Sequence, residues 1–358
     1  MPQSYTACII EALAHPAPLG GAGKPLSSFR TLLNQDHFRS NRSDCRLGFL
    51  TEATASAGSF DITAPSTSAQ TPGPGAGQTG TIESTGSLTV SGSTNAVTIS
   101  GDNATLTNLG TLMTSLNSAA AGNQVVDFNA ILSGANTVNN FAGAVMQASE
   151  ADAVRPGVNG VVDNAGTIKS TTTTGSSSDG VDAQSNSGVQ ITNDTGGLIE
   201  GGRHGITGGQ ALASSIFTMR VTNNSGATIQ GDNGSGIYID AFNGAGALET
   251  VTVVNHGLIT GNGVTGDGDG VDVDGLVNIT NTGTILSKNA VGSASEGLSV
   301  GGGTITNSGT IEGSLAAGNT TASGVGVLAV MGDTTLSLVR ADDGRELRHP
   351  DRDWPDFR

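Results

Sequence analysis

Short alternations of apolar and polar residues, separated by turns that contain Asn and Gly, recur along much of the chain. The phrase "ITNSGTIEG" (305–313) repeats "ITNTGTILS" (279–287) after 26 residues, and "VVNHGLITG" (253–261) precedes both. Because side chains at i and i+2 of a strand share one face, Ile305 and Asn307 are expected to point one way and Thr306 the other. This period of two predicts strands.

The phrase has the form [I/V/L]-T-N-x-G-x-I, and about nine units of it fill residues 78–330. A weaker copy is "VNNFAGAV" (138–145). The aligned asparagines are Asn108, Asn164, Asn193, Asn223, Asn255, Asn281 and Asn307. The closing aliphatic residues, 23 to 33 positions apart, are Ile82, Leu112, Val145, Ile168, Ile199, Ile229, Ile259, Ile285 and Ile311.

A second phrase follows each of the later copies and consists of a polar residue, a glycine and then an apolar residue. Examples are "DGVDA" (179–183), "HGITG" (204–208) and "EGLSV" (296–300). His204 is therefore expected to be a turn residue that replaces the Ser, Asp or Asn of other units. Gly, Thr and Asn all lower helix stability, so each unit is predicted to contain two short strands joined by turns and variable loops.

If each unit forms one coil, successive copies stack about 4.8 Å apart as a parallel β-helix. The closing aliphatic residues then form continuous inward columns. The asparagines also stack, and each side-chain amide is expected to donate a hydrogen bond to the next. The fold class predicted from the residues is therefore all-β, a solenoid of about nine coils.

Composition agrees with a thin core of small and β-branched residues. Apolar residues make up 35% of the chain, aromatic residues only 3%, and 55 residues are Gly. Residues 51–339 contain five basic and 22 acidic residues, a net charge of −17. Because such a surface repels phosphate backbones, nucleic-acid binding is excluded as a function of this region. The chain contains no apolar run long enough for a membrane-spanning helix.

The two ends do not continue the pattern. Residues 1–65, which contain Cys8 and Cys45, are predicted to be an atypical and disordered N-terminal segment, and 66–77 a linker rich in Pro, Gly and Ser. The repeats are assigned to 78–335 and a charged C-terminal tail to 336–358. The repeats contain no cysteine, so neither disulfides nor a thiolate metal site is expected to stabilise them.

These tandem "ITNxGTIxG" units, acidic and free of cysteine, resemble the passenger region of bacterial autotransporters of type V secretion. The resemblance covers about residues 78–330 and implies a right-handed, single-stranded parallel β-helix that is secreted or displayed at the outer membrane. Such proteins end in a translocator barrel, and residues 331–358 are too few to form one. We therefore expect that the barrel is missing from this chain and that the chain is a truncated gene product.

Acidic residues are the best candidates for chemistry. The segment "GDGDGVDVD" (266–274) carries Asp267, Asp269, Asp272 and Asp274, and resembles one imperfect calcium-binding nonapeptide. Its alternative interpretation is a solvated turn between strands. Glu296 lies one coil beyond Asp269, near enough for a carboxylate pair of the kind that β-helix polysaccharide lyases and hydrolases use.

The repeats contain no convergent catalytic set, so the sequence predicts a non-enzymatic, adhesin-like stalk or a fragment of one. No cofactor or metal is expected. Binding of glycans or proteins on host or neighbouring cells is assigned to the unrepeated loops 171–178, 208–219 and 241–250. The alternatives that stay open are a β-helix carbohydrate-active enzyme using the acids of 267–296, and a chain without any function of its own.

Overall fold

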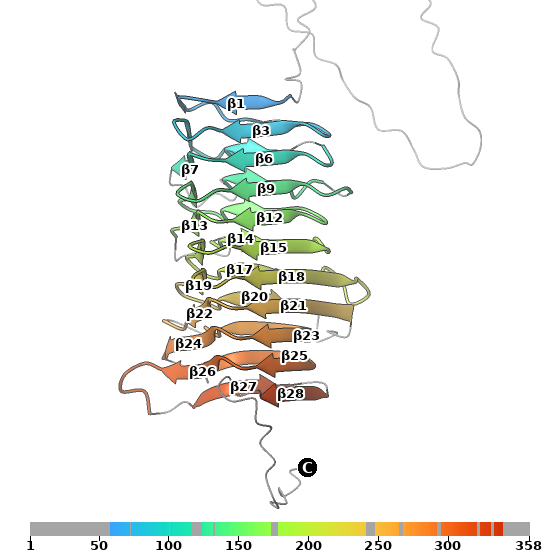
Figure 1. Cartoon of the computed structure of the whole chain (residues 1–358), viewed down its shortest axis with the longest axis vertical. Coiled ribbons are helices and arrows are strands. Elements are labelled where there is room, and N and C mark those ends of the chain that lie inside the picture. The colour runs from blue at the N-terminus through green and yellow to red at the C-terminus, as the bar shows by residue number, and fades with distance from the viewer. Residues whose placement is uncertain are drawn as a thin grey trace, which may run out of the picture. The chain divides into compact units, whose positions relative to one another are not determined.

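A computed structural model describes residues 58–338, except 72, 100, 116–123, 132, 173–177, 241–247, 265–267, 292–294, 321–322 and 331–332. The described residues form an all-β parallel β-solenoid, as predicted, and include no helix (Figure 1). The solenoid has about eight turns, whereas the repeats predicted about nine coils. None of them belongs to a helix long and apolar enough to span a bilayer. The predicted disorder of 1–57 and the predicted tail from 339 onward lie outside the described residues.

Each complete turn passes through three strand positions, and each position forms a parallel ladder along the solenoid. The first ladder contains β5 (Val97–Thr98), β8 (Val126–Asp127), β11 (Val154–Arg155), β14 (Val181–Asp182), β17 (Ile206–Gly209), β20 (Ile237–Asp240), the starts of β23 (Val271–Asn281) and β25 (Ser295–Asn307), and β27 (Gly324–Ala329). It corresponds to the second phrase of the repeat.

The second ladder holds the asparagine-containing phrase. It consists of β1 (Phe60–Ile62), β3 (Thr79–Ile82), β6 (Thr105–Asn108), β9 (Thr137–Asn140), β12 (Val161–Asn164), β15 (Val189–Asn193), β18 (Phe217–Asn223), β21 (Glu249–Asn255), the ends of β23 and β25, and β28 (Thr334–Leu338). Its inward residues alternate with outward Thr, Asn and Gln, which explains the period of two.

The third ladder carries the closing aliphatic residues. Its strands are β2 (Pro65–Ser66), β4 (Ser87–Ser91), β7 (Thr111–Ser115), β10 (Val145–Ala148), β13 (Thr167–Ser170), β16 (Leu198–Gly201), β19 (Thr228–Gly231), β22 (Leu258–Asn262), β24 (Thr284–Ala290) and β26 (Thr310–Leu315). The predicted column Ile168, Ile199, Ile229, Ile259 and Ile285 is fully buried in it, whereas Ile311 is half-buried.

Two predicted members of this column belong elsewhere. Ile82 lies in β3 and pairs in register with Asn108, so Leu88 is the closing residue of its coil. Val145 pairs with Thr111 and points outward, while Met146 lies beside Leu112. The inward residue follows its asparagine by an even number of residues, four for Leu112 and six for Met146, whereas Val145 follows Asn140 by five, and a shift of one residue changes the face.

The solenoid also begins earlier than the predicted boundary at 78. The second and third ladders start at β1 and β2, and Gln70 forms a parallel bridge with Val97. The Gly73 nitrogen donates to the carbonyl of Thr98 at 2.6 Å, and a Cβ at Gly73 would lie 2.8 Å from that oxygen. The glycines of the predicted linker 66–77 therefore permit close packing. At the other boundary, β28 extends to Leu338.

Candidate functional site

The predicted asparagines lie at the ends of the second-ladder strands, with their side chains inside. Together with Asn140, they form an asparagine ladder in which each Nδ2 donates to the Oδ1 of the next asparagine at 2.7–3.0 Å, from Asn108 to Asn307. Asn140 belongs to the weaker copy and completes the series. The sequence "VNNFAGAV" already indicated this asparagine, although its Gly follows Asn140 by three residues and not by the two of the repeated phrase.

Each amide of the asparagine ladder, up to Asn281, also donates to a backbone carbonyl at the start of the neighbouring third-ladder strand. Asn193, for example, donates to Thr228 O at 2.9 Å, and Asn223 to Leu258 O at 3.1 Å. Both amide hydrogens therefore have partners inside the solenoid, which removes the cost of burying a polar group. These side chains bind neighbouring coils, so a ligand has no access to them.

A second internal column lies at the corner before the first ladder. This corner column consists of Asn95, Gln124, Asp152, Asp179, His204, Ser235, Asp269 and Glu296. In five of its members, a side-chain oxygen or nitrogen accepts a hydrogen bond from the backbone N–H of the next member at 2.9–3.0 Å. The polar residue that opens the second phrase thus caps the following coil, in the way that a side chain caps a helix N-terminus.

The predicted acids are placed by this column. Asp269 accepts a hydrogen bond from the backbone nitrogen of Glu296 at 3.0 Å, and both side chains are buried. A solvated turn is therefore wrong for Asp269. Asp272 and Asp274 lie in β23 and face outward, Asp272 beside Tyr238 in the ladder. Asp267 lies outside the described residues.

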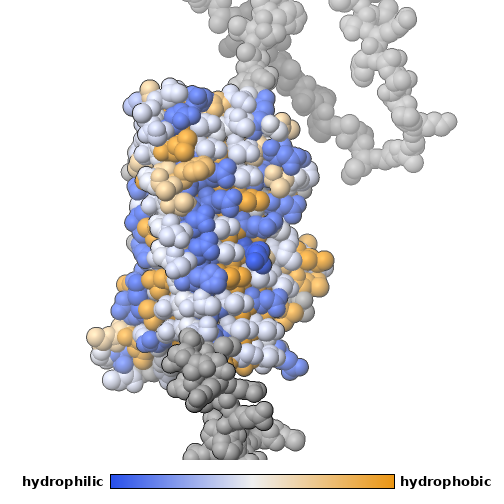
Figure 2. Space-filling view, viewed as in Figure 1, coloured by the Kyte–Doolittle hydropathy of each residue, from blue (hydrophilic) through white to orange (hydrophobic). Residues whose placement is uncertain are grey.

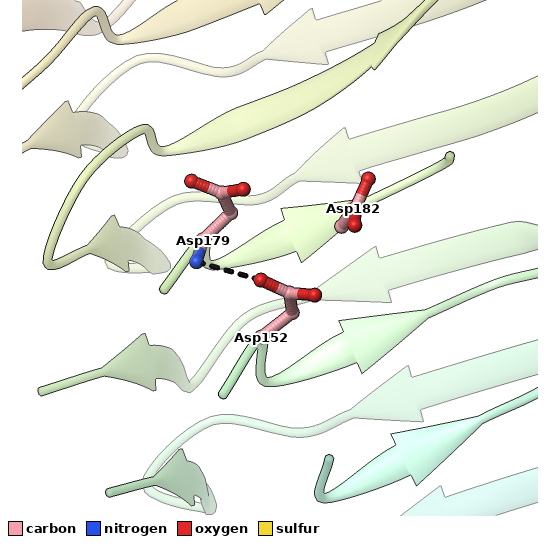
Figure 3. Close-up of side chains that lie close together, drawn as sticks. All are labelled: Asp152, Asp179 and Asp182. Atoms are coloured by element: carbon pink, nitrogen blue, oxygen red, sulfur yellow. Dashed lines mark hydrogen bonds between the residues drawn. The ribbon is translucent and has the colours of Figure 1, made fainter. Parts of the chain in front are cut away.

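The structure brings together a different set of acids, from an earlier part of the chain. Asp152, Asp179 and Asp182 offer carboxylate oxygens that all lie within 4.8 Å of one another, and no other such trio of His, Cys, Asp or Glu occurs among the described residues. Figure 3 shows Asp152 and Asp179 on adjacent coils, with Asp182 beside them in β14. The repeat pattern does not reveal this cluster, because Asp152 opens "DAV", an Ala variant of the second phrase.

Two arginines bind this acidic cluster. Arg155 donates to Asp152 Oδ2 from Nε and Nη2 at 3.0 and 2.7 Å, and lies 3.7 Å from Asp182. Arg203 forms a bidentate pair with Asp179 at 3.1 and 2.6 Å. The remaining cluster oxygens accept backbone N–H groups of Asp179, His204 and Gln184, and the Gln184 side chain. Every carboxylate oxygen of the cluster therefore has a donor.

Burial changes the ionisation of the cluster. It raises the pKa of Asp182 to about 8, and the nearby charges of Asp152 and Asp179 act in the same direction. Burial likewise raises the pKa of Asp179 to about 6, although Arg203 opposes this shift. In His204, burial and the charge of Arg203 lower the pKa to about 3, so its neutral ring accepts the Ser235 N–H and stacks on Tyr238.

A catalytic or metal role would need free oxygens and access. Three carboxylates are a suitable set for a hard cation, but the arginines already supply the compensating charge and donors occupy each oxygen. A hydrolase pair also needs an open face for the sugar, whereas Asp152 and Asp179 are completely buried. The arrangement therefore suits connection of successive coils better than turnover or ion binding.

The raised pKa of Asp182 gives a test of this interpretation. Between its ordinary pKa near 4 and its folded pKa of about 8, folded Asp182 holds a proton that the unfolded chain releases, so its contribution to stability falls as pH rises. Asp182→Asn mimics the protonated form. We expect thermal unfolding of Asp182→Asn at pH 8 to lie at least about 2 °C above the wild type, and the difference to shrink as the pH falls and to disappear near pH 4.

Asp163→Asn, on the outward face of β12, is the control for removal of one negative charge and should shift the midpoint little at either pH. A midpoint of Asp182→Asn below the wild type at pH 8 would contradict the assignment of the raised pKa.

Comparison of the chain with known protein families, with curated proteins and with solved structures gave no match.

Proposed function

We propose that the chain is a non-enzymatic, adhesin-like stalk, similar to the passenger region of autotransporters, that acts outside the cell or at the bacterial surface. The observation that carries the proposal is the use of the repeated polar side chains. The asparagine ladder and five bonds of the corner column connect coil to coil inside the solenoid. Such side chains stabilise the solenoid, so ligands are expected to bind to unrepeated surface segments.

The acidic surface and the parallel stacking support the same proposal. A solenoid in which every coil contacts only its neighbours gives an extended surface suited to display, and net negative charge favours solubility outside the cell. The resemblance to autotransporters also implies a right-handed coil; this handedness and the count of about nine coils, which comes from the repeats, stay predictions. The rival proposal is a carbohydrate-active enzyme that uses the acids of 267–296.

Two measurements on the full chain separate these functions. Beads coated with the protein should adhere to bacterial or epithelial cells above beads coated with albumin, as expected for a stalk that binds surfaces. Incubation with polyuronates and neutral polysaccharides should release no reducing ends or unsaturated sugars. Polysaccharide turnover that disappears in Asp269→Asn or Glu296→Gln would overturn the non-enzymatic proposal. Bead adhesion equal to that of albumin would overturn the adhesin-like function.

A further inference from the structure

One shallow groove lies on the outward face of the solenoid, across the starts of three second-ladder strands. It has a volume of about 300 Å³ and is lined by Gly188, Gln190, Thr218, Arg220, Thr250 and Thr252, with backbone of β15, β18 and β21 beneath. Gly188 precedes β15 at the position where the next two coils carry Thr218 and Thr250. The positive φ of Gly188 and the Asn159 side chain packed against it require a glycine at this position.

Arg220 gives this groove a positive charge that the described residues do not neutralise. Its side chain is exposed, and no described acid pairs with it, whereas Arg155, Lys169 and Arg203 each bind a carboxylate. Its ladder neighbours on the same face, Gln190 and Thr252, are neutral. A guanidinium presents a planar set of donors that matches a carboxylate, so the groove is complementary to one anionic group.

Exposed aliphatic side chains lie at the rim of the groove. Ile216 and Leu248 immediately precede β18 and β21, whose first residues pair, and are 69% and 42% exposed. Leu212, in the turn closed by its hydrogen bonds with Ser215, is 59% exposed. Figure 2 shows apolar side chains gathered at this end of the strands. These residues lie in or beside the unrepeated loops 208–219 and 241–250, away from the buried core.

The chemistry of the rim selects among anionic ligands. Sugars usually stack on aromatic faces, but among the described residues the aromatic residue beside the rim, Phe217, is buried in the core. Phosphate polymers need several cations, and the described groove offers one. Aliphatic side chains beside a single arginine suit a peptide segment that carries an acidic residue flanked by aliphatic residues.

We propose that the groove of β15, β18 and β21 is the recognition site of the stalk and that it binds a protein segment of this acidic–aliphatic kind. The proposal rests on the adhesin-like function proposed above and names its partner chemistry. Arg220 holds the carboxylate of the partner, and Ile216, Leu248 and Leu212 cover its aliphatic side chains. The threonine hydroxyl groups along the groove donate to and accept from its backbone.

The test is selection of a phage-displayed library of random peptides on the immobilised full chain. Enriched peptides should contain Asp or Glu next to Leu, Ile or Val. Their affinity should fall at least about tenfold in Arg220→Gln, because a charge-assisted bidentate contact is lost, and clearly in Ile216→Ser. Lys288→Gln, which removes an equal charge from β24, is the matched control and should bind as the wild type does.

All variants change exposed or half-exposed side chains, and equal thermal unfolding midpoints confirm that each is folded. Selection of peptides without acidic residues, or equal binding by Arg220→Gln, overturns this site while leaving the adhesin-like function standing. Arg220-dependent binding of a uronate oligosaccharide in place of peptides overturns the protein partner. Failure of both the peptide selection and the bead adhesion removes the proposed function together with the site.

Discussion

Asp152→Leu is expected to lower the free energy of unfolding by roughly 2–4 kcal/mol, because it removes one partner of a buried ion pair. The substitution removes the oxygen that accepts from both Nε and Nη2 of Arg155, whose side chain is only 17% exposed. It also removes the oxygen that accepts the buried N–H of Asp179. The loss stays below that of an isolated buried pair because Asp182, 3.7 Å from Arg155, can ionise and replace part of the charge.

Chemical denaturation followed by circular dichroism measures this loss. Asp152→Asn keeps an oxygen for the Asp179 N–H and removes only the charge, so it should fall between Asp152→Leu and the wild type. If both variants unfold at the wild-type denaturant concentration, the acidic cluster does not stabilise the solenoid, and its burial would need another explanation.

Asn223→Leu is expected to have a comparable effect, roughly 2–4 kcal/mol, since it interrupts the asparagine ladder in its middle. The side chain of Asn223 is fully buried, accepts from Asn193 and donates to Asn255 and to Leu258 O. Leucine has about the right volume but leaves the Oδ1 of Asn255 and the Leu258 carbonyl without this donor. Unsatisfied buried acceptors carry the desolvation cost that the ladder otherwise offsets.

The neighbouring residue supplies the control. Asn224 donates to Asp194 on the surface of the solenoid, so Asn224→Ala should change stability by less than about 0.5 kcal/mol. Because unfolding of a solenoid need not be two-state, hydrogen exchange of the amides in β18 and β21 is the decisive measurement. Asn223→Leu should accelerate exchange there, and equal exchange in the two variants would contradict a stabilising role of the ladder.

The fold was predictable because successive coils repeat the same sequence phrase. Ile285 and Ile311, or Asn255 and Asn281, occupy equivalent positions in adjacent copies, so period and composition were enough to indicate a parallel solenoid. Prediction was poorer where a coil lacks the phrase. Residues 60–77 pair with the next coil through Gly73 and Gln70, which carry no periodic apolar signal. After Asn140 the inward residue is Met146, one position beyond the predicted Val145.

The candidate sites depended on distances that the sequence does not contain. Asp152 and Asp179 are 27 residues apart in the chain but adjacent in the corner column. The arginines that bind them could be assigned only once the coils were stacked. Arg220 is a single charge in its part of the sequence. Its role could be inferred only from the groove across β15, β18 and β21 and from Ile216 and Leu248, which adjoining coils bring to one rim.

The asparagine ladder has a direction. Every Nδ2 from Asn108 to Asn281 donates toward the C-terminal side and every Oδ1 accepts from the N-terminal side, so the amide dipoles add along the axis. Aligned hydrogen bonds of this kind polarise one another. The interior of the solenoid therefore has an electrical polarity along its axis. A coil added in the reversed orientation would place one asparagine Oδ1 against another, so coils can be added to the ladder in one orientation only.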